Sequence, residues 1–392
     1  MSVIFAACGS STPPVVCNAS NGGNCSCAAS GTAACPAERS EFLYSSGGTI
    51  SSGLQFQIFP INPSTGTLGS PAIEAGIDFG VMAITPSGQF YYAAEDNGIY
   101  GYSIGPTAAL TALPGSPFPA NFLNPLALTV DPTGTFLYVS DAYHSSLAGF
   151  AIDSSTGALS QVPGSPFSNN FYTNRAALSP SGNFLYVVDG GSDSGIAGLS
   201  AYSVNRTTGT LTPISGGTFT YSGYGSENFD VAVHPSGQFL YFTEDDGIHA
   251  FTIDQSTGAL TQISSPPLIS VPYPMQLTMN SSDTVLYVGV GGDGTIAAYS
   301  INPSSGALTQ VADSPYQVTP NPAPANVLFS FALDPLGQFL YVQGGNATTD
   351  GIVEFSVNPS TGALTQLGIV PDPSPPGIEI NRPLLFTAVQ VP

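Results

Sequence analysis

The stretch Pro235-Ser-Gly-Gln-Phe-Leu-Tyr241 decides the fold, because near-copies of it recur along the chain. Copies begin at Pro86, Pro132, Pro180 and Pro335, and each runs from a turn containing glycine into an aromatic segment that ends in tyrosine. With two degenerate copies, the final tyrosines lie 46 to 55 residues apart: Tyr44, Tyr92, Tyr138, Tyr186, Tyr241, Tyr287 and Tyr341. A period of this length indicates a repeat architecture.

A second phrase, first seen as Ile61-Asn-Pro-Ser-Thr-Gly-Thr-Leu68, alternates with the first. It returns at Ile152–Leu159, Val204–Leu211, Ile253–Leu260, Ile301–Leu308 and Val357–Leu364, and in a shortened form at Ile104–Leu110. In each copy Asn, Asp, Ser or Thr favours a turn, and glycine can adopt the positive φ that a tight turn needs. The two phrases therefore predict two turns, and so four short strands, in every unit.

The fourth unit shows the expected strands most clearly. From the innermost to the outermost they are strand A (Arg175–Leu178), strand B (Phe184–Val188), strand C (Ile196–Val204) and strand D (Leu211–Ile214). A unit of this length with one four-stranded sheet is typical of a propeller blade. The sequence therefore predicts an all-β, seven-bladed β-propeller with four-stranded antiparallel blades.

The two ends of the repeat region predict how the ring closes. The first unit begins directly at strand B (Phe42–Ser45), and a spare strand (Leu384–Val391) follows the last unit. We expect the spare strand to become strand A of the first blade, in a 1+3 closure that also removes exposed sheet edges. Residues 37–392 then form the propeller, and residues 1–36 form a separate N-terminal segment.

Composition excludes several classes of partner. The chain of 392 residues has four arginines and no lysine against 25 acidic residues, which gives a formal charge of -21. Binding to nucleic acid depends on cations that neutralise phosphates, so we expect no nucleic-acid partner. No apolar run approaches the roughly 18 residues that a transmembrane helix needs.

The N-terminal segment predicts export. Phe5-Ala-Ala-Cys8 resembles a bacterial lipoprotein box, whose cysteine carries a lipid anchor; the alternative is a short apolar N-terminus with a chance cysteine. Cys17, Cys25, Cys27 and Cys35 favour two disulfides in an oxidising compartment, with three connectivities open. A four-thiolate metal site is the alternative, although the paired two-residue gaps of zinc ribbons are absent. These features predict an extracellular or cell-surface protein reached by bacterial-type export.

The repeated phrases resemble the lactonase-type seven-bladed propellers, the family of 6-phosphogluconolactonase and the muconate-lactonizing enzymes. The resemblance covers roughly residues 40–392 and implies lactone chemistry carried by an Arg, a His and a Glu. The nearest match to the family's catalytic pattern runs from Asn228 to Asp245. It keeps His234-Pro235 and has Asp245 at the Glu position, but Phe229-Asp230 replaces the Arg-His pair.

In a propeller of this strand order, the A–B and C–D turns share one face, and the B–C and D–A loops share the other. The second face carries the charges and is where we expect any site, around the mouth of the central channel. A substitute catalytic site would combine His144, Arg175 and Glu227, which are one imidazole, one cation and one carboxylate from adjacent blades. The alternative is that all three are ordinary surface charges.

Acidic residues on the B–C loops raise the possibility of a Ca²⁺ site, with Glu244, Asp245 and Asp246 as the candidate ligands. The alternative is that these acids only solvate the loops. His249 is expected to be packed or edge-exposed within a strand rather than catalytic, and His234 to belong to a turn. The sequence requires no other cofactor.

Two functional hypotheses follow from the sequence. The first is a secreted or surface-tethered binding or self-assembly module without catalysis, whose partner is a second copy of the chain, a polymer of copies or a cell-surface ligand. The second is a lactone hydrolase of the resembled family, acting at the channel mouth.

Overall fold

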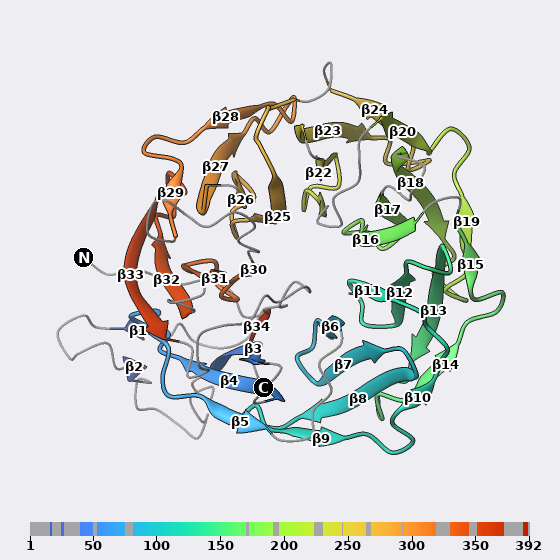
Figure 1. Ribbon diagram of the computed structural model, residues 1–392, viewed down its shortest axis with the longest axis horizontal. Coiled ribbons are helices and arrows are strands. Elements are labelled where there is room, and N and C mark those ends of the chain that lie inside the picture. The colour runs from blue at the N-terminus through green and yellow to red at the C-terminus, as the bar shows by residue number, and fades with distance from the viewer. Residues whose placement is uncertain are drawn as a thin grey trace.

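The computed structural model describes residues 16–17, 25–26, 40–49, 53–74, 81–169, 172–190, 196–222, 230–244, 246–263, 268–291, 293–318, 330–344, 351–371 and 387–390. These residues form seven sheets of four or five strands that follow one another around a ring (Figure 1). Among them there is no helix that could span a membrane. The predicted seven-bladed all-β propeller is confirmed.

Each sheet is one blade, whose strands run in order from the innermost outwards. Blade 1 contains β34 (Thr387–Gln390), β3 (Glu41–Thr49), β4 (Gly53–Ile61) and β5 (Ala72–Glu74). Blade 2 contains β6 (Val81–Ile84), β7 (Phe90–Glu95), β8 (Gly98–Ile104), β9 (Leu110–Ala112) and β10 (Phe118–Pro119). Blade 3 contains β11 (Pro125–Val130), β12 (Phe136–Asp141), β13 (Ser146–Ile152), β14 (Leu159–Gln161) and β15 (Phe167–Ser168).

The remaining four blades repeat this order. Blade 4 contains β16 (Tyr172–Leu178), β17 (Phe184–Gly190), β18 (Ile196–Val204), β19 (Leu211–Pro213) and β20 (Phe219–Ser222). Blade 5 contains β21 (Val231–Val233), β22 (Phe239–Glu244), β23 (Gly247–Ile253) and β24 (Leu260–Gln262). Blade 6 contains β25 (Pro274–Met279), β26 (Val285–Val290), β27 (Thr295–Ile301), β28 (Leu308–Gln310) and β29 (Tyr316–Gln317). Blade 7 contains β30 (Ser330–Leu333), β31 (Phe339–Gly344), β32 (Gly351–Val357) and β33 (Leu364–Pro371).

The ring closes as the sequence predicts. Strand β34, near the C-terminus, pairs antiparallel with β3, with Phe42 opposite Val389 and Tyr44 opposite Thr387. It therefore supplies the innermost strand of blade 1, whose other three strands come from the start of the repeat region. The described part of this strand, Thr387–Gln390, lies within the expected Leu384–Val391, and the rest of that range is outside the described residues.

Among the described residues, four blades have an outermost strand that is divided in two, a feature that the sequence pattern did not predict. In blade 3, β14 and β15 both pair with β13, and a turn containing Ser165 separates them. The Ser165 hydroxyl accepts a hydrogen bond from the Gly149 backbone N–H (2.9 Å). Ser116 and Ser314 do the same in blades 2 and 6, so a serine hydroxyl satisfies a strand C donor where the outer strand is interrupted.

The tyrosine that ends each first phrase joins its blade to the next one. The Tyr92 hydroxyl donates a hydrogen bond to the Gly157 carbonyl in the C–D turn of the following blade (2.7 Å). Equivalent bonds run from Tyr44 to Ala108, Tyr138 to Gly209, Tyr186 to Gly258, Tyr241 to Gly306, Tyr287 to Gly362 and Tyr341 to Gly66. The two repeated phrases thus supply the donor and the acceptor of one contact at every blade interface.

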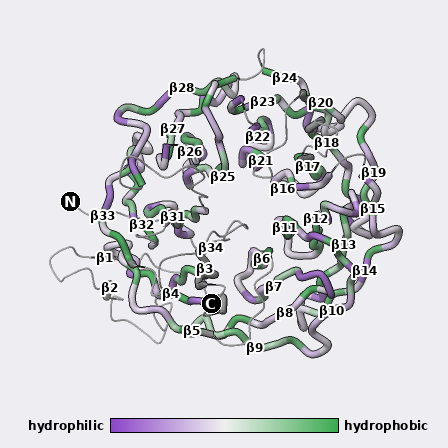
Figure 2. The backbone as a smooth tube through the Cα atoms, in the orientation of Figure 1, coloured by the Kyte–Doolittle hydropathy of each residue, from purple (hydrophilic) through white to green (hydrophobic). Residues whose placement is uncertain are grey.

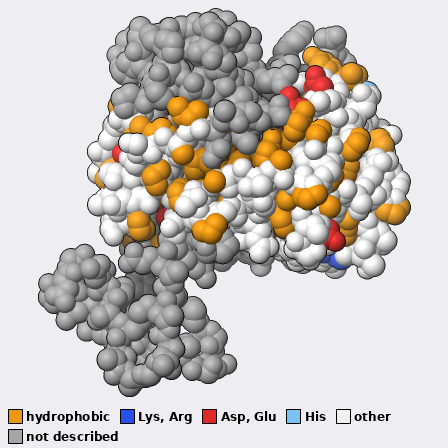
Figure 3. Space-filling view, turned by 90° about the horizontal axis from the view of Figure 1, so that it is seen from below, with side chains coloured by type: hydrophobic (Ala, Val, Ile, Leu, Met, Phe, Trp, Pro, Cys, Tyr) orange, Lys and Arg blue, Asp and Glu red, His pale blue; other side chains and the backbone are white. Residues whose placement is uncertain are grey.

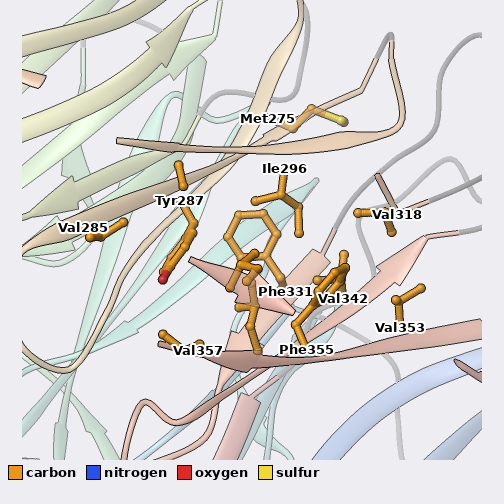
Figure 4. Packing of buried hydrophobic residues seen from close by; sticks show 13 residues of the cluster. Met275, Val285, Tyr287, Ile296, Val318, Phe331, Val342, Val353, Phe355 and Val357 are labelled. Atoms are coloured by element: carbon orange, nitrogen blue, oxygen red, sulfur yellow. The ribbon is translucent and has the colours of Figure 1, made fainter. Parts of the chain in front are cut away.

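The hydrophobic core lies between neighbouring blades, and hydrophobic stretches recur in every blade around the ring (Figure 2). Between blades 6 and 7, Phe331 and Phe355 pack in one cluster with Tyr287 and Ile296 (Figure 4). Strands alternate their side chains between two faces, so each sheet buries one set of residues against each neighbour. Burial of both faces needs the complete ring.

The N-terminal segment is described only at β1 (Val16–Cys17) and β2 (Cys25–Ser26), which form a two-stranded pair. Cys17 stands opposite Cys25 in its register, and no disulfide is recorded among the described residues. Cys8, Cys27 and Cys35 lie outside those residues. The disulfides, the lipid anchor and export therefore stay predictions.

Candidate functional site on the loop face

The positions of the turns define two faces of the ring. Arg206, in the C–D turn of blade 4, donates a hydrogen bond to the Gly182 carbonyl in the A–B turn of the same blade. It also forms an ion pair with Asp131 in the A–B turn of blade 3 (2.9 Å). The A–B and C–D turns therefore share one face, which we call the turn face. The B–C and D–A loops form the opposite face, which we call the loop face.

Three consecutive blades place a polar side chain at the same position of the innermost strand. Arg175, Asp230 and Gln276 each lie 11 residues before the tyrosine of their blade. Gln276 pairs its side-chain amide with the backbone N–H (2.8 Å) and carbonyl (3.2 Å) of Phe331 in the next blade. Asp230 likewise accepts a hydrogen bond from the Leu277 N–H of its following blade (2.8 Å). This position therefore points each side chain towards the next blade around the ring axis.

Arg175 and Asp230 interact as opposite charges between blades 4 and 5. Both side chains are half-buried. Burial raises the pKa of the Asp230 carboxyl, while Arg175 and two backbone N–H groups oppose that rise. Burial lowers the pKa of the Arg175 guanidinium, and Asp230 opposes this shift. The loop face thus holds a half-buried cation beside a carboxyl group whose pKa is raised.

His144 is held by a neighbour in its own loop. Its Nδ1 donates a hydrogen bond to Asp141 Oδ2 (2.5 Å), and Asp141 also accepts bonds from the backbone N–H groups of Leu123 and Asn124. The adjacent Tyr143 packs edge-on against Tyr172, at the start of the strand that carries Arg175 (ring centroids 5.3 Å apart). The B–C loop of blade 3 therefore lies against blade 4, but His144 is directed to Asp141.

The described residues include two members of the predicted triad, His144 and Arg175. Glu227 lies outside the described residues, and the described contacts connect His144 to Asp141 and Arg175 to Asp230. Asp230 is the partner that sequence reasoning missed, because it was treated only as the replacement of a family residue. The signal was present: Asp230 occupies the place where the resembled family has an imidazole.

The predicted acidic cluster of blade 5 gains a histidine. His249 Nε2 lies 2.7 Å from Asp246 Oδ1 and 3.4 Å from Glu244 Oε2. One ligand atom of each residue lies within 4.8 Å of the others. Asp245 is outside the described residues. His249 is buried in β23, as expected for a strand residue, yet its ring reaches the loop acids.

Comparison with known proteins agrees with this architecture. No curated protein matches the chain. Among solved structures, the periplasmic gluconolactonase of Pseudomonas aeruginosa is 19% identical, with 89% of this chain and 100% of that chain covered and a TM-score of 0.67. A candidate 6-phosphogluconolactonase of Bacteroides uniformis is 17% identical, with 90% and 100% covered and a TM-score of 0.70. At these identities the likeness concerns the fold alone.

A family model gives the assignment. The model described as lactonase, seven-bladed β-propeller, matches residues 106–218 and again residues 218–329, which together are more than half of the chain. The matched region contains the pair formed by Arg175 and Asp230 and the cluster around His249. The chain therefore belongs to the lactonase seven-bladed β-propeller family.

Proposed function

We propose that the loop face binds a small lactone around the ring axis and hydrolyses it, with Arg175 and Asp230 contacting the reacting ring. The observation that carries this proposal is the pairing of these two charges from adjacent blades. The family pattern has an Arg-His pair within one blade, and here the same unit has Phe229-Asp230. Arg175 of the preceding blade supplies the missing cation beside Asp230.

The two groups suit the two requirements of lactone hydrolysis. A guanidinium can stabilise the negative charge that develops on the carbonyl oxygen when water attacks the carbonyl carbon. A carboxylate with a raised pKa can accept a proton from that water. The ring C–O bond then breaks, and the proton passes to the departing ring oxygen, so one lactone and one water give one hydroxy acid.

The test is hydrolysis of a panel of sugar and aliphatic lactones by the full chain and by Arg175→Gln. We expect kcat/KM to fall by at least about 100-fold in this variant, because a transition-state contact is lost. Arg206→Gln is the matched control, since it removes the same kind of side chain from the turn face. Its kcat/KM should stay within about twofold of the parent at a temperature where both are folded.

Asp230→Asn tests proton acceptance by the carboxylate separately from charge stabilisation by Arg175. It should lower kcat more than it changes KM, because the proton acceptor acts in the transition state. Absence of hydrolysis across the panel, or full activity in Arg175→Gln, would count against the proposal.

Self-assembly is a second candidate, favoured by the outer edge of blade 7. Strand β33 has eight residues, with one β-bulge at Leu367, whereas β9, β14, β19, β24 and β28 have three each. Two hydrophobic side chains on it are exposed, Leu367 (43%) and Ile369 (56%), and Ile73 on the outer strand of blade 1 is exposed as well. A long hydrophobic edge without charge can pair with another strand. In Figure 3, which shows one side of the ring, hydrophobic side chains are scattered over the described surface and few acidic or basic side chains are seen.

The expected occupant of this edge is β33 of a second copy. Static light scattering over a range of concentrations should show a rising mass for the parent chain and a constant monomer mass for Leu367→Lys/Ile369→Lys. Leu336→Lys, at an exposed hydrophobic residue in an A–B turn, is the control and should behave like the parent. A parent that stays monomeric at high concentration would exclude this role.

A further inference from the structure

We propose that Glu244, Asp246 and His249 bind a divalent transition-metal ion at the loop face of blade 5. The three residues lie in one hairpin, in which β22 ends at Glu244 and β23 begins at Gly247. The ligands of this site do not include Arg175 or Asp230, and the site does not depend on the proposed hydrolysis, although the Asp230 N–H donates to the hydroxyl of Thr243, the neighbour of Glu244 (2.9 Å).

The spacing of the ligand atoms fits one ion. With bonds of about 2.1 Å, two ligands of a tetrahedral or octahedral ion lie about 3.0 to 3.4 Å apart. The imidazole Nε2 is already 3.4 Å from Glu244 Oε2 and 2.7 Å from Asp246 Oδ1. All three ligand atoms lie within 4.8 Å of one another, so the widest pair closes by up to about 1.4 Å when the ion binds, and Nε2 loses the proton that it donates to Asp246. That proton leaves to solvent as the metal takes its place.

The ligand set selects the class of metal. Ca²⁺ prefers six to eight oxygen ligands, so the Ca²⁺ expected from the acidic residues alone fits poorly once a nitrogen is among them. One imidazole with two carboxylates is a ligand set for Zn²⁺, Mn²⁺, Fe²⁺ or Co²⁺. The structure thus favours a different metal from the one the sequence suggested.

The backbone around the cluster holds the ligands in place. Glu244 is paired with Gly247 in the β22–β23 register, which leaves a two-residue connection. Gly247 has φ of +147°, and a Cβ there would overlap the carbonyl of Ile269, so only glycine fits. Ile248 and Ile269 pair next to it, with the Ile248 N–H donating to the Ile269 carbonyl (2.9 Å). Because these backbone contacts already order the strand that follows the connection, less conformational entropy is lost when the metal binds.

Packing also fixes the imidazole. The His249 ring stacks on Phe242, its cross-strand neighbour (ring centroids 4.8 Å apart, planes inclined by 19°). The side chain is only 1% exposed, whereas that of Asp246 is 55% exposed. The cluster is therefore anchored from inside the blade and open to solvent on the Asp246 side. An open side leaves room for water or a further ligand, as in metal sites with three protein ligands.

The test is titration of the chelator-treated full chain with Co²⁺, followed by visible absorption, with Zn²⁺ as competitor. We expect one Co²⁺ per chain with the weak d–d bands of nitrogen and oxygen ligands, and displacement by Zn²⁺ but not by Ca²⁺ at equal concentration. An intense thiolate-to-cobalt band would instead place the ion on the N-terminal cysteines and overturn the proposal.

Variants assign the ligands. His249→Gln should weaken Co²⁺ binding by at least about 100-fold and Asp246→Asn by at least about 10-fold. Asp293→Asn is the matched control, because it removes one acid from another B–C loop of the same face, and its affinity should stay within twofold. If His249→Gln fails to fold, the exposed Asp246→Asn decides. No Co²⁺ uptake, or equal weakening in Asp246→Asn and Asp293→Asn, would refute the site.

Discussion

The hydroxyl of Tyr341 donates a hydrogen bond to the carbonyl of Gly66 (2.8 Å), and this bond joins the last blade to the first. Both residues belong to the repeated phrases, and they lie 275 positions apart in the sequence. The bond is the same contact that joins every other pair of neighbouring blades, from Tyr44 to Ala108 onwards. The closing interface is thus built like the interfaces between consecutive units.

Removing the Tyr341 hydroxyl should weaken the closing interface. Tyr341→Phe leaves a buried carbonyl without its donor, so we expect a loss of about 1 to 2 kcal/mol in the free energy of unfolding. Urea denaturation followed by circular dichroism gives this value. Tyr143→Phe, at an exposed tyrosine, should change it by less than about 0.5 kcal/mol. A Tyr341→Phe protein as stable as the parent, next to a destabilised Tyr138→Phe, would show that the closing bond does not form.

Gly66 is sensitive for two reasons that a pair of variants can separate. Gly66 and Gly216 have nearly the same backbone conformation, with φ of +73° and +72°. A Cβ on Gly66 would overlap the Phe339 ring of blade 7, whereas a Cβ on Gly216 meets nothing within 4 Å. Gly216→Ala should therefore show only the left-handed strain of about 1 kcal/mol. Gly66→Ala should lose about 1 to 3 kcal/mol more from overpacking. Equal losses in thermal or urea unfolding would rule out the clash.

Arg206 stabilises the turn face by joining blades 3 and 4. Its Nη1 pairs with the buried Asp131 (2.9 Å), and its Nη2 donates to the Thr133 hydroxyl (3.0 Å). Arg206→Gln should lower the unfolding free energy by about 2 kcal/mol at pH 7, because the buried carboxylate loses a charged partner. A double-mutant cycle with Asp131→Asn measures the coupling. Additive effects of the two substitutions would contradict the inferred ion pair.

The contribution of Asp131 to the free energy of unfolding should also fall in acid. Burial alone raises the pKa of Asp131, but hydrogen bonds from Thr133, Phe136 and Arg206 outweigh it, so the net pKa is lowered. A carboxyl whose folded pKa is lowered stabilises the protein above the unfolded pKa, about 3.9, and this stability is lost as pH falls through the folded value. Asp131→Asn should therefore be less stable than the parent at pH 7, with the difference shrinking below pH 4.

For Glu41, at the closing interface, we expect the opposite pH dependence of its contribution to the free energy of unfolding. It is buried in β3, and its Oε2 has no hydrogen-bond partner among the described residues. Burial, and then the charge of Asp334 in blade 7, raise the pKa of Glu41. Glu354 belongs to the same group of charges. After burial, the charges of Asp334, Glu354 and Glu41 also raise the pKa of the Tyr341 hydroxyl.

A carboxyl whose folded pKa is raised destabilises the protein as pH rises above its unfolded pKa of about 4.3. Glu41→Gln should therefore be more stable than the parent at pH 7 by on the order of 1 kcal/mol, and the gain should vanish near pH 4. Urea midpoints at the two pH values measure it. Asp96→Asn, an exposed acid, controls for net charge and should show no such gain. A gain that is equal at both pH values would contradict the raised pKa of Glu41.

The fold could be predicted because the repeated phrases carry both sides of the blade interface. Tyr186 ends one phrase and Gly258 lies in the other, so the recurrence of both along the chain already implied a ring. The divided outer strand was missed, although Ser116-Pro117, Ser165-Pro166 and Ser314-Pro315 repeat at equivalent places. The role of these serines depends on a hydroxyl reaching strand C, which the sequence pattern does not reveal.

The candidate sites were less predictable because they depend on loops outside the repeated phrases. Arg175 was expected near the charged face, but its partner Asp230 comes from the next blade, where only the ring geometry brings them together. His249 was expected to be either packed or edge-exposed within its strand, and it is packed on Phe242. Its approach to Glu244 and Asp246 follows from the two-residue connection of the hairpin, a local feature that sequence spacing alone left open.

The tyrosine bonds also give the molecule a circular order without a terminal unit. In an open array of repeats, the end units contact one neighbour only and can fray before the rest unfolds. In this ring blade 1 contacts blade 7 through the same bond that it makes with blade 2, so every blade has two neighbours. Melting of any blade would expose the flanks of two others at once, which makes the whole ring a single cooperative unit.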